Sequence, residues 1–153
     1  MTSSASNSTR WLLRIAAVLW VIWGVVHLLA GIATIAQVSS GSVAEAVQAI
    51  TNAVPLEELQ DEYNSSIQAI LIQHGFNLAW FGLVTLIGAF FVWRQNITGI
   101  WVTAMVGGLA DLGYFTAIDL QGLAAFPGPQ MTYICATAIL LSAIAYFRDL
   151  RHA

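Results

Sequence analysis

Four long apolar stretches, separated by short polar segments, dominate the pattern of this chain. They cover about residues 11–38, 67–93, 97–118 and 131–147. An α-helix needs about 20 apolar residues to cross the hydrocarbon core of a bilayer. The pattern therefore predicts an all-α, four-helix transmembrane bundle that forms a single integral membrane domain over residues 1–153. The fourth stretch is rather short, so its ends are expected among the lipid headgroups.

The longest polar segment, residues 39–66, joins the first two stretches. Apolar residues recur in it at helical spacing from Val43 to Val54, which predicts a short amphipathic helix. Pro55 suits the first turn of a second short helix. The acidic residues that follow are Glu57, Glu58, Asp61 and Glu62. We expect the first helix to lie on the bundle or in the membrane interface as a lid. The acidic run is then a solvated face or, alternatively, a vestibule that attracts cations.

The start of the chain allows two interpretations. Residues 1–9 are small and polar and are expected to form a disordered tail. A positive start and small residues near Ala36 would permit a cleaved signal peptide. The apolar run is longer than the 7–15 residues typical of the apolar region within a signal peptide, so we expect the segment to stay in the protein as a spanning helix.

Composition supports lipid as the solvent and excludes several kinds of chemistry. Charged residues make up 8% of the chain and mean hydropathy is +0.75, whereas a soluble domain carries roughly 25% charged residues. All five basic residues are arginines, which excludes a lysine Schiff base and gives no indication of a nucleic-acid partner. The single cysteine, Cys135, excludes an internal disulfide and a Cys-x-x-Cys redox centre.

The arginines predict the orientation of the bundle. In a four-span arrangement they all lie on the side that holds both termini and the second turn: Arg10, Arg14, Arg94, Arg148 and Arg151. Positive charge marks the cytoplasmic side of a membrane protein. We therefore expect both termini in the cytoplasm, with the protein in a bacterial inner membrane.

Polar residues inside the apolar stretches are the candidates for a functional site. They are His27, Gln73, His74, Asn77, Asp111, Tyr114 and Tyr133. At about 1.5 Å per helical residue, they lie roughly 20–30 Å from the arginine side, in the outer half of a core about 30 Å thick. We expect them to line a ligand-binding or proton-binding pocket.

The helix faces strengthen this prediction for the first three stretches. His27 shares a stripe of small residues with Gly24 and Gly31, and Asp111 shares one with Gly107. The second stretch shows a comparable stripe at His74, Asn77, Phe81, Thr85 and Gly88. Such stripes mark close packing of membrane helices, so His27, His74, Asn77 and Asp111 are expected to face inward.

Each candidate also has a purely structural interpretation. Buried histidines, Gln73 and Asn77 commonly serve as hydrogen-bond partners between helices, and buried tyrosines commonly pack. Asp111 is harder to explain in this way. Placing an aspartate in the hydrocarbon costs about 2.5–3.5 kcal/mol on insertion scales, whereas one interhelical hydrogen bond returns about 0.6–2 kcal/mol. Asp111 is therefore the leading candidate for a protonatable group, with His27 as its partner.

Three function classes remain open. The leading hypothesis is a small transporter or ligand-binding component whose pocket, open toward the acidic side, binds or moves a proton or small polar ligand. So thin a bundle favours a homodimer or a larger membrane complex, with a smooth contact surface at Gly99, Gly107, Gly108 and Gly113.

The second hypothesis is a redox subunit in which His27 and His74 ligate a b-type haem or a metal. Against it, the two histidines differ in depth by several ångströms, and the outer side has no arginine for haem propionates. The third hypothesis is an enzyme that acts on a lipophilic substrate by Asp/His acid–base chemistry. The sequence does not name the catalytic residues or the ligand.

Overall fold

The computed structural model describes residues 6–151, and within that range every regular element is helical. Four helices are long and apolar enough to cross a membrane: Asn7–Ser39, Ser65–Trp93, Ile97–Asp119 and Gln130–Leu150. This confirms an all-helical chain with four helices of membrane-spanning length and supports its assignment as a membrane protein.

The long helices are joined by shorter elements. The main helices are α1 (Asn7–Ser39), α3 (Ser65–Trp93), α4 (Ile97–Tyr114) and α5 (Gln130–Ala145). A π-helical turn extends α4 over Phe115–Asp119, and another extends α5 over Tyr146–Leu150. Between α1 and α3 lie α2 (Val43–Ile50) and a 3-10 turn, Leu56–Leu59.

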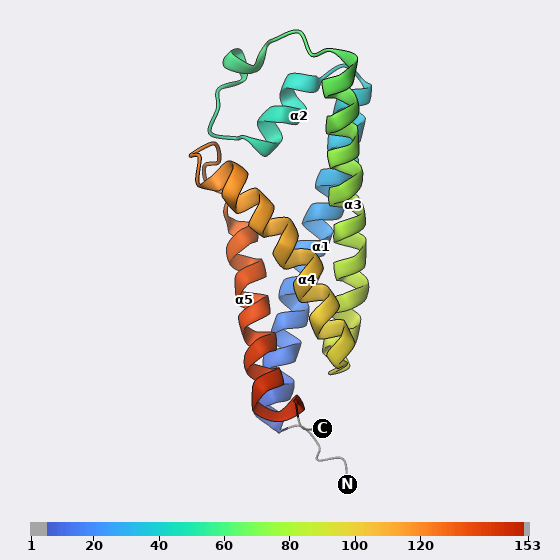
Figure 1. Cartoon of the computed structure of the whole chain (residues 1–153), viewed down its shortest axis with the longest axis vertical. Coiled ribbons are helices and arrows are strands. Elements are labelled where there is room, and N and C mark those ends of the chain that lie inside the picture. The colour runs from blue at the N-terminus through green and yellow to red at the C-terminus, as the bar shows by residue number, and fades with distance from the viewer. Residues whose placement is uncertain (1–5, 152–153) are drawn as a thin grey trace.

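The bundle has two distinct ends (Figure 1). The start of α1, the end of α5 and the α3–α4 turn lie together at the lower end. We call it the arginine end, because these segments carry Arg10, Arg14, Arg94 and Arg148. The guanidinium of Arg14 stacks over the Trp93 ring at 5.3 Å, which joins α1 to the end of α3. The opposite end, which we call the loop end, carries α2 and the loop that follows it.

Helix α1 packs most extensively against α3, and four glycines allow the two backbones to approach closely. A Cβ added to Gly82 would lie 2.5 Å from the carbonyl oxygen of Gly24, and one added to Gly75 would lie 2.8 Å from that of Gly31. Small residues permit this approach in membrane helices. The predicted stripe of α1 is confirmed at Gly24 and Gly31.

The predicted packing stripe of α3 is buried at Thr85 and Gly88, but it is wrong in its rotation nearer the loop end. The face of α3 that meets α1 carries Gly75 and Gly82 rather than His74 and Phe81. A shift of one residue turns a helix face by about 100°. His74 therefore lies at the edge of the α1–α3 contact instead of at its centre.

The glycines of α4 also differ from their predicted use. A Cβ on Gly99 would collide with the Phe91 side chain, and one on Gly107 would collide with the Trp20 ring. Both glycines are buried inside the bundle. They serve packing within one chain, so the predicted contact surface for a second copy is wrong at these two positions. Assembly with a second copy or a larger complex stays a prediction.

Helix α1 begins earlier than the predicted polar tail allows. Ser6 caps the helix by accepting the Thr9 N–H, so Asn7 to Thr9 are helical rather than disordered; residues 1–5 of that tail lie outside the described range. The Thr9 hydroxyl donates to the Asp149 carboxylate at 2.7 Å. This bond joins the first turn of α1 to the end of α5.

At the loop end, a short helix forms where the sequence predicts one, although it stops at Ile50. Val43 and Ala46 of α2 pack with Val38 of α1. The Asn52 side chain donates to the Ala125 carbonyl at 2.9 Å and accepts its N–H at 2.7 Å. The α1–α3 and α4–α5 connections are thereby joined. The role of α2 as a lid in the membrane interface stays a prediction.

Candidate functional site: a buried His–Asp pair beside an open cavity

Asp111 of α4 is buried among polar partners from two other helices. Its side chain is 7% exposed. The indole N–H of Trp23 donates to Oδ2 at 2.9 Å, and Nε2 of His27 lies 3.9 Å from Oδ1. The Cys135 thiol of α5 lies against the same carboxylate. The predicted meeting of His27 and Asp111 is confirmed.

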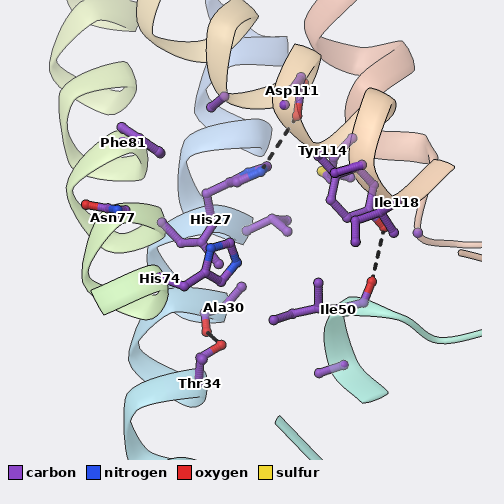
Figure 2. A pocket seen from close by; sticks show the side chains of 18 of the residues that line it. His27, Ala30, Thr34, Ile50, His74, Asn77, Phe81, Asp111, Tyr114 and Ile118 are labelled. Atoms are coloured by element: carbon purple, nitrogen blue, oxygen red, sulfur yellow. Dashed lines mark hydrogen bonds and ion pairs between the residues drawn. The ribbon is translucent and has the colours of Figure 1, made fainter. Parts of the chain in front are cut away.

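Trp23 fixes the orientation of His27. The two residues are four apart on α1, so they lie one above the other on the same helix face. Nδ1 of His27 lies 2.9 Å from the Trp23 carbonyl oxygen. The two rings stack, with centroids 3.6 Å apart and planes inclined by 17°. Nε2 is therefore directed toward Asp111, as Figure 2 shows.

This orientation determines which nitrogen carries a proton. A carbonyl oxygen only accepts hydrogen bonds, so Nδ1 must be the protonated donor. In a neutral imidazole, Nε2 is then an acceptor, and an ionised carboxylate is also an acceptor. At 3.9 Å the two groups make no direct hydrogen bond. A proton on either group, or a donor between them such as a water molecule, can satisfy both acceptors.

A cavity of about 1140 Å³ lies beside this pair, between α1, α3 and α4, with residues of α2 and the α4–α5 loop over it. Its polar lining residues are His27, Thr34, Gln37, Asn52, His74, Asn77, Asp111, Tyr114 and Gln130. Large apolar side chains line most of the remainder, among them Val26, Leu78, Phe81, Val106, Ile118 and Met131. The side chain of His27 is 13% exposed, so the cavity gives access to the pair.

Five of the seven predicted site residues line this cavity: His27, His74, Asn77, Asp111 and Tyr114. The His74 ring lies near that of His27 in Figure 2. The Asn77 side chain accepts the Trp80 indole N–H at 3.1 Å, and the Tyr114 hydroxyl donates to the Ile50 carbonyl at 3.5 Å. The structure thus brings polar groups of α1, α3 and α4 to one space.

Gln73 and Tyr133 do not line the cavity, and their predicted place in the pocket is wrong. Gln73 is exposed, because it lies one residue before His74 and points to a different side of α3. Tyr133 is 69% exposed. The buried face of α5 instead carries Cys135 and Ala138. An estimate of depth along α5 was therefore not enough to identify the face on which Tyr133 lies.

Two residues of the site were not among the predicted site residues. Trp23 stacks on His27 and hydrogen-bonds Asp111, and Cys135 contacts the same carboxylate. The sequence does carry a signal for Trp23. Tryptophan prefers the membrane interface, so a tryptophan in the middle of a span indicates a special role. The position of Cys135 opposite Asp111 depends on the helix packing, which the sequence alone does not give.

The haem alternative meets a specific constraint here. Both histidines line the cavity, but an iron bound to His27 would need Nε2, the atom that faces Asp111. Among the described residues, no arginine lines the cavity to pair with propionates. The haem or metal hypothesis stays a prediction, which the absorbance spectrum and metal content of the purified protein would test.

The acidic run takes no part in the cavity. Glu57, Glu58, Asp61 and Glu62 are absent from its lining within the range 6–151. The residues that both line the cavity and are strongly exposed include Met105 and Leu109 of α4, at 59% and 65%. Asn52, Pro127 and Gln130 at the loop end also line the cavity and are exposed, so the opening toward the acidic side stays a prediction.

Comparison with protein families, curated proteins and solved structures finds no match for this chain. The fold and site define a class of molecule: a four-helix membrane protein with a buried His–Asp pair beside an open, mainly apolar cavity. Function must be inferred from the chemistry of that site, because a fold supports many functions.

Proposed function

We propose that this chain is a small membrane protein whose His27–Asp111 pair binds a proton or the polar group of a small ligand within the cavity. The orientation of His27 is the observation that carries this proposal. With Nδ1 donating to the Trp23 carbonyl, Nε2 is left to face the carboxylate. Nε2 and the carboxylate can then each accept a proton or a hydrogen bond from a ligand.

The distance within the pair supports binding over a purely structural role. Nε2 and Oδ1 are 3.9 Å apart, beyond the range of a direct hydrogen bond. Polar contacts of this length commonly include a water molecule, and the polar atom of a ligand could take the same place. A pair kept for packing alone would be expected to close this gap.

The partners of Asp111 also suit a carboxylate that gains and loses a proton. The Trp23 indole N–H donates to Oδ2 at 2.9 Å, while Oδ1 is directed toward His27 and the cavity. One oxygen is thereby held in place, and the other is left to accept a proton or a ligand hydrogen bond. Movement of the proton or ligand across the bundle, and catalysis on a lipophilic substrate, stay predictions.

Infrared spectroscopy of the purified protein tests proton binding directly. We expect a carboxylic acid C=O band that appears and disappears with pH and is lost in Asp111→Asn. Asp149→Asn is the matched control, because Asp149 lies at the arginine end and bonds Ser6 and Thr9. A spectrum in which Asp111→Asn removes no pH-dependent band while the protein stays folded would overturn the proposal.

We further propose that the arginine end faces the cytoplasm of a bacterial inner membrane. Arginines on the side that holds both termini support this orientation. Reporter fusions after Arg94 and after Arg151 should both give a cytoplasmic signal, whereas a fusion after Gln60 should give an external one. An external signal from the fusion after Arg151 would contradict the proposed topology.

A further inference from the structure

We infer that the cavity binds a neutral lipophilic molecule with one oxygen-bearing head group, which enters sideways from the bilayer between α3 and α4. This inference rests on the proposed function, because the His27–Asp111 pair supplies the hydrogen-bond partner of the head group. It assigns the class of ligand that the proposed function leaves open.

The first argument is the size of the cavity. Pockets for drug-sized ligands have volumes of roughly 300–1,000 Å³, and a water molecule takes about 30 Å³. The cavity, at about 1140 Å³, is far larger than a proton or a small polar ligand requires. Its walls include Val26, Leu78, Phe81 and Val106. Most of this space therefore suits a hydrocarbon body.

The second argument is the position of the mouth. Trp80 of α3 and Met105 and Leu109 of α4 line the cavity and are also 37%, 59% and 65% exposed. At about 1.5 Å per residue from the α3–α4 turn, they lie roughly 14–21 Å from the arginine end. This level is within a hydrocarbon core about 30 Å thick. This opening between α3 and α4 thus faces acyl chains, whereas the exposed lining residues Asn52, Pro127 and Gln130 lie at the loop end.

The packing of α4 explains why a mouth exists there. Near the turn, α4 contacts α3 closely, because Gly88 meets Thr103 and Gly99 meets Phe91. Toward the loop end, α4 leans toward α5 and away from α3 (Figure 1), and Gly108 contacts Ile139 of α5. The cavity occupies the angle between the diverging helices, with α1 behind it.

The third argument concerns the charge of the head group. The ionisable residues of the lining are His27, His74, Asp111 and Tyr114. An anionic head would approach the Asp111 carboxylate and find no arginine among the lining residues in the range 6–151. A cationic head would compete with His27 for that carboxylate. A neutral hydroxyl or carbonyl can instead exchange a hydrogen bond with the pair.

Photolabelling in nanodiscs tests this inference with two probes that differ in the head alone. One is a long-chain alcohol that carries a diazirine in its chain, and the other is the fatty acid of the same chain, used at a pH where it is ionised. We expect the alcohol to label residues around Trp80, Met105 and Leu109. The ionised acid should label them about tenfold less, because an unpaired anion is costly at this depth.

A pair of variants separates the cavity from the lipid-facing surface. Leu109→Trp narrows the mouth, whereas Leu112→Trp adds the same side chain at an exposed leucine of α4 that does not line the cavity. Labelling by the alcohol should fall severalfold in Leu109→Trp and stay unchanged in Leu112→Trp. Equal labelling in both variants, or labelling spread evenly over all four helices, would overturn the inference.

Asp111→Asn separates this inference from the proposed function. If this variant loses the pH-dependent carboxyl band and is labelled more weakly by the alcohol, the result supports both the proposed function and the neutral lipophilic ligand. If the band is lost but labelling by alcohol and acid is equal in the parent protein, the proton site stands and the neutral lipophile is wrong. If alcohol labelling is selective but Asp111→Asn changes neither it nor the carboxyl band, the proposed function and the head-group contact are both overturned.

Discussion

Replacing either His27 or Asp111 by leucine is expected to destabilise the bundle by about 3 kcal/mol, and replacing both should cost less than the two single changes together. Removing one member of a buried pair leaves the other uncompensated, which typically costs about 3–5 kcal/mol. The lower end applies here, because the cavity gives both side chains some access to water.

The double variant is not expected to recover the parent stability in full. Without Asp111, the Trp23 indole N–H loses its acceptor, and an unsatisfied buried donor costs about 1–3 kcal/mol. Adding Trp23→Phe to the double variant removes that donor and should recover much of this loss. The measurement is a double-mutant cycle on unfolding in detergent, with an expected coupling of about 1–3 kcal/mol between His27 and Asp111.

His74 offers a matched control for this cycle. It lines the same cavity, but His27 is the histidine whose ring nitrogen faces Asp111. Coupling between His74→Leu and Asp111→Leu should therefore stay within about 0.5 kcal/mol, the range of additive changes. If the coupling between His27 and Asp111 is also within about 0.5 kcal/mol, the two side chains do not interact in the folded protein, and the site described above is wrong.

The class of the protein was predictable from the sequence because the bilayer imposes a simple requirement. A segment must be apolar over about 20 residues and satisfy its own backbone, which an α-helix does. The same requirement makes an internal polar residue conspicuous. His27 and Asp111 were found in this way: both lie on faces that also carry small residues, and those faces turned inward.

The shape of the site was harder to predict because it depends on small rotations and tilts. Gly75 rather than His74 lies at the centre of the α3 contact with α1, and that rotation moves His74 to the cavity wall. The angle between α3 and α4 is set by local contacts such as Gly88 with Thr103. Tilt follows from packing against neighbouring helices, so neither the volume of the cavity nor its sideways mouth could be derived from spacing.

Gly31→Leu is expected to be among the most damaging changes in the chain, although it replaces a poor helix former by a good one. A side chain at Gly31 would meet the backbone of Gly75 and Ala79 on α3, which cannot rotate away as a flexible side chain can. Overpacking a core costs typically 1–3 kcal/mol and occasionally more. The loss should lie at or above the upper end of that range.

Gly113→Leu is the matched control for Gly31→Leu, since a Cβ at Gly113 meets nothing within 4 Å. It should be neutral or should stabilise α4 by up to about 1 kcal/mol, the difference in helix propensity between the two residues. Thermal unfolding of both variants in the same detergent measures the contrast. Because the α1–α3 contact places His27 beside the cavity, Gly31→Leu should also weaken alcohol photolabelling. Equal stability of the two variants would show that α1 and α3 do not approach each other through their glycines.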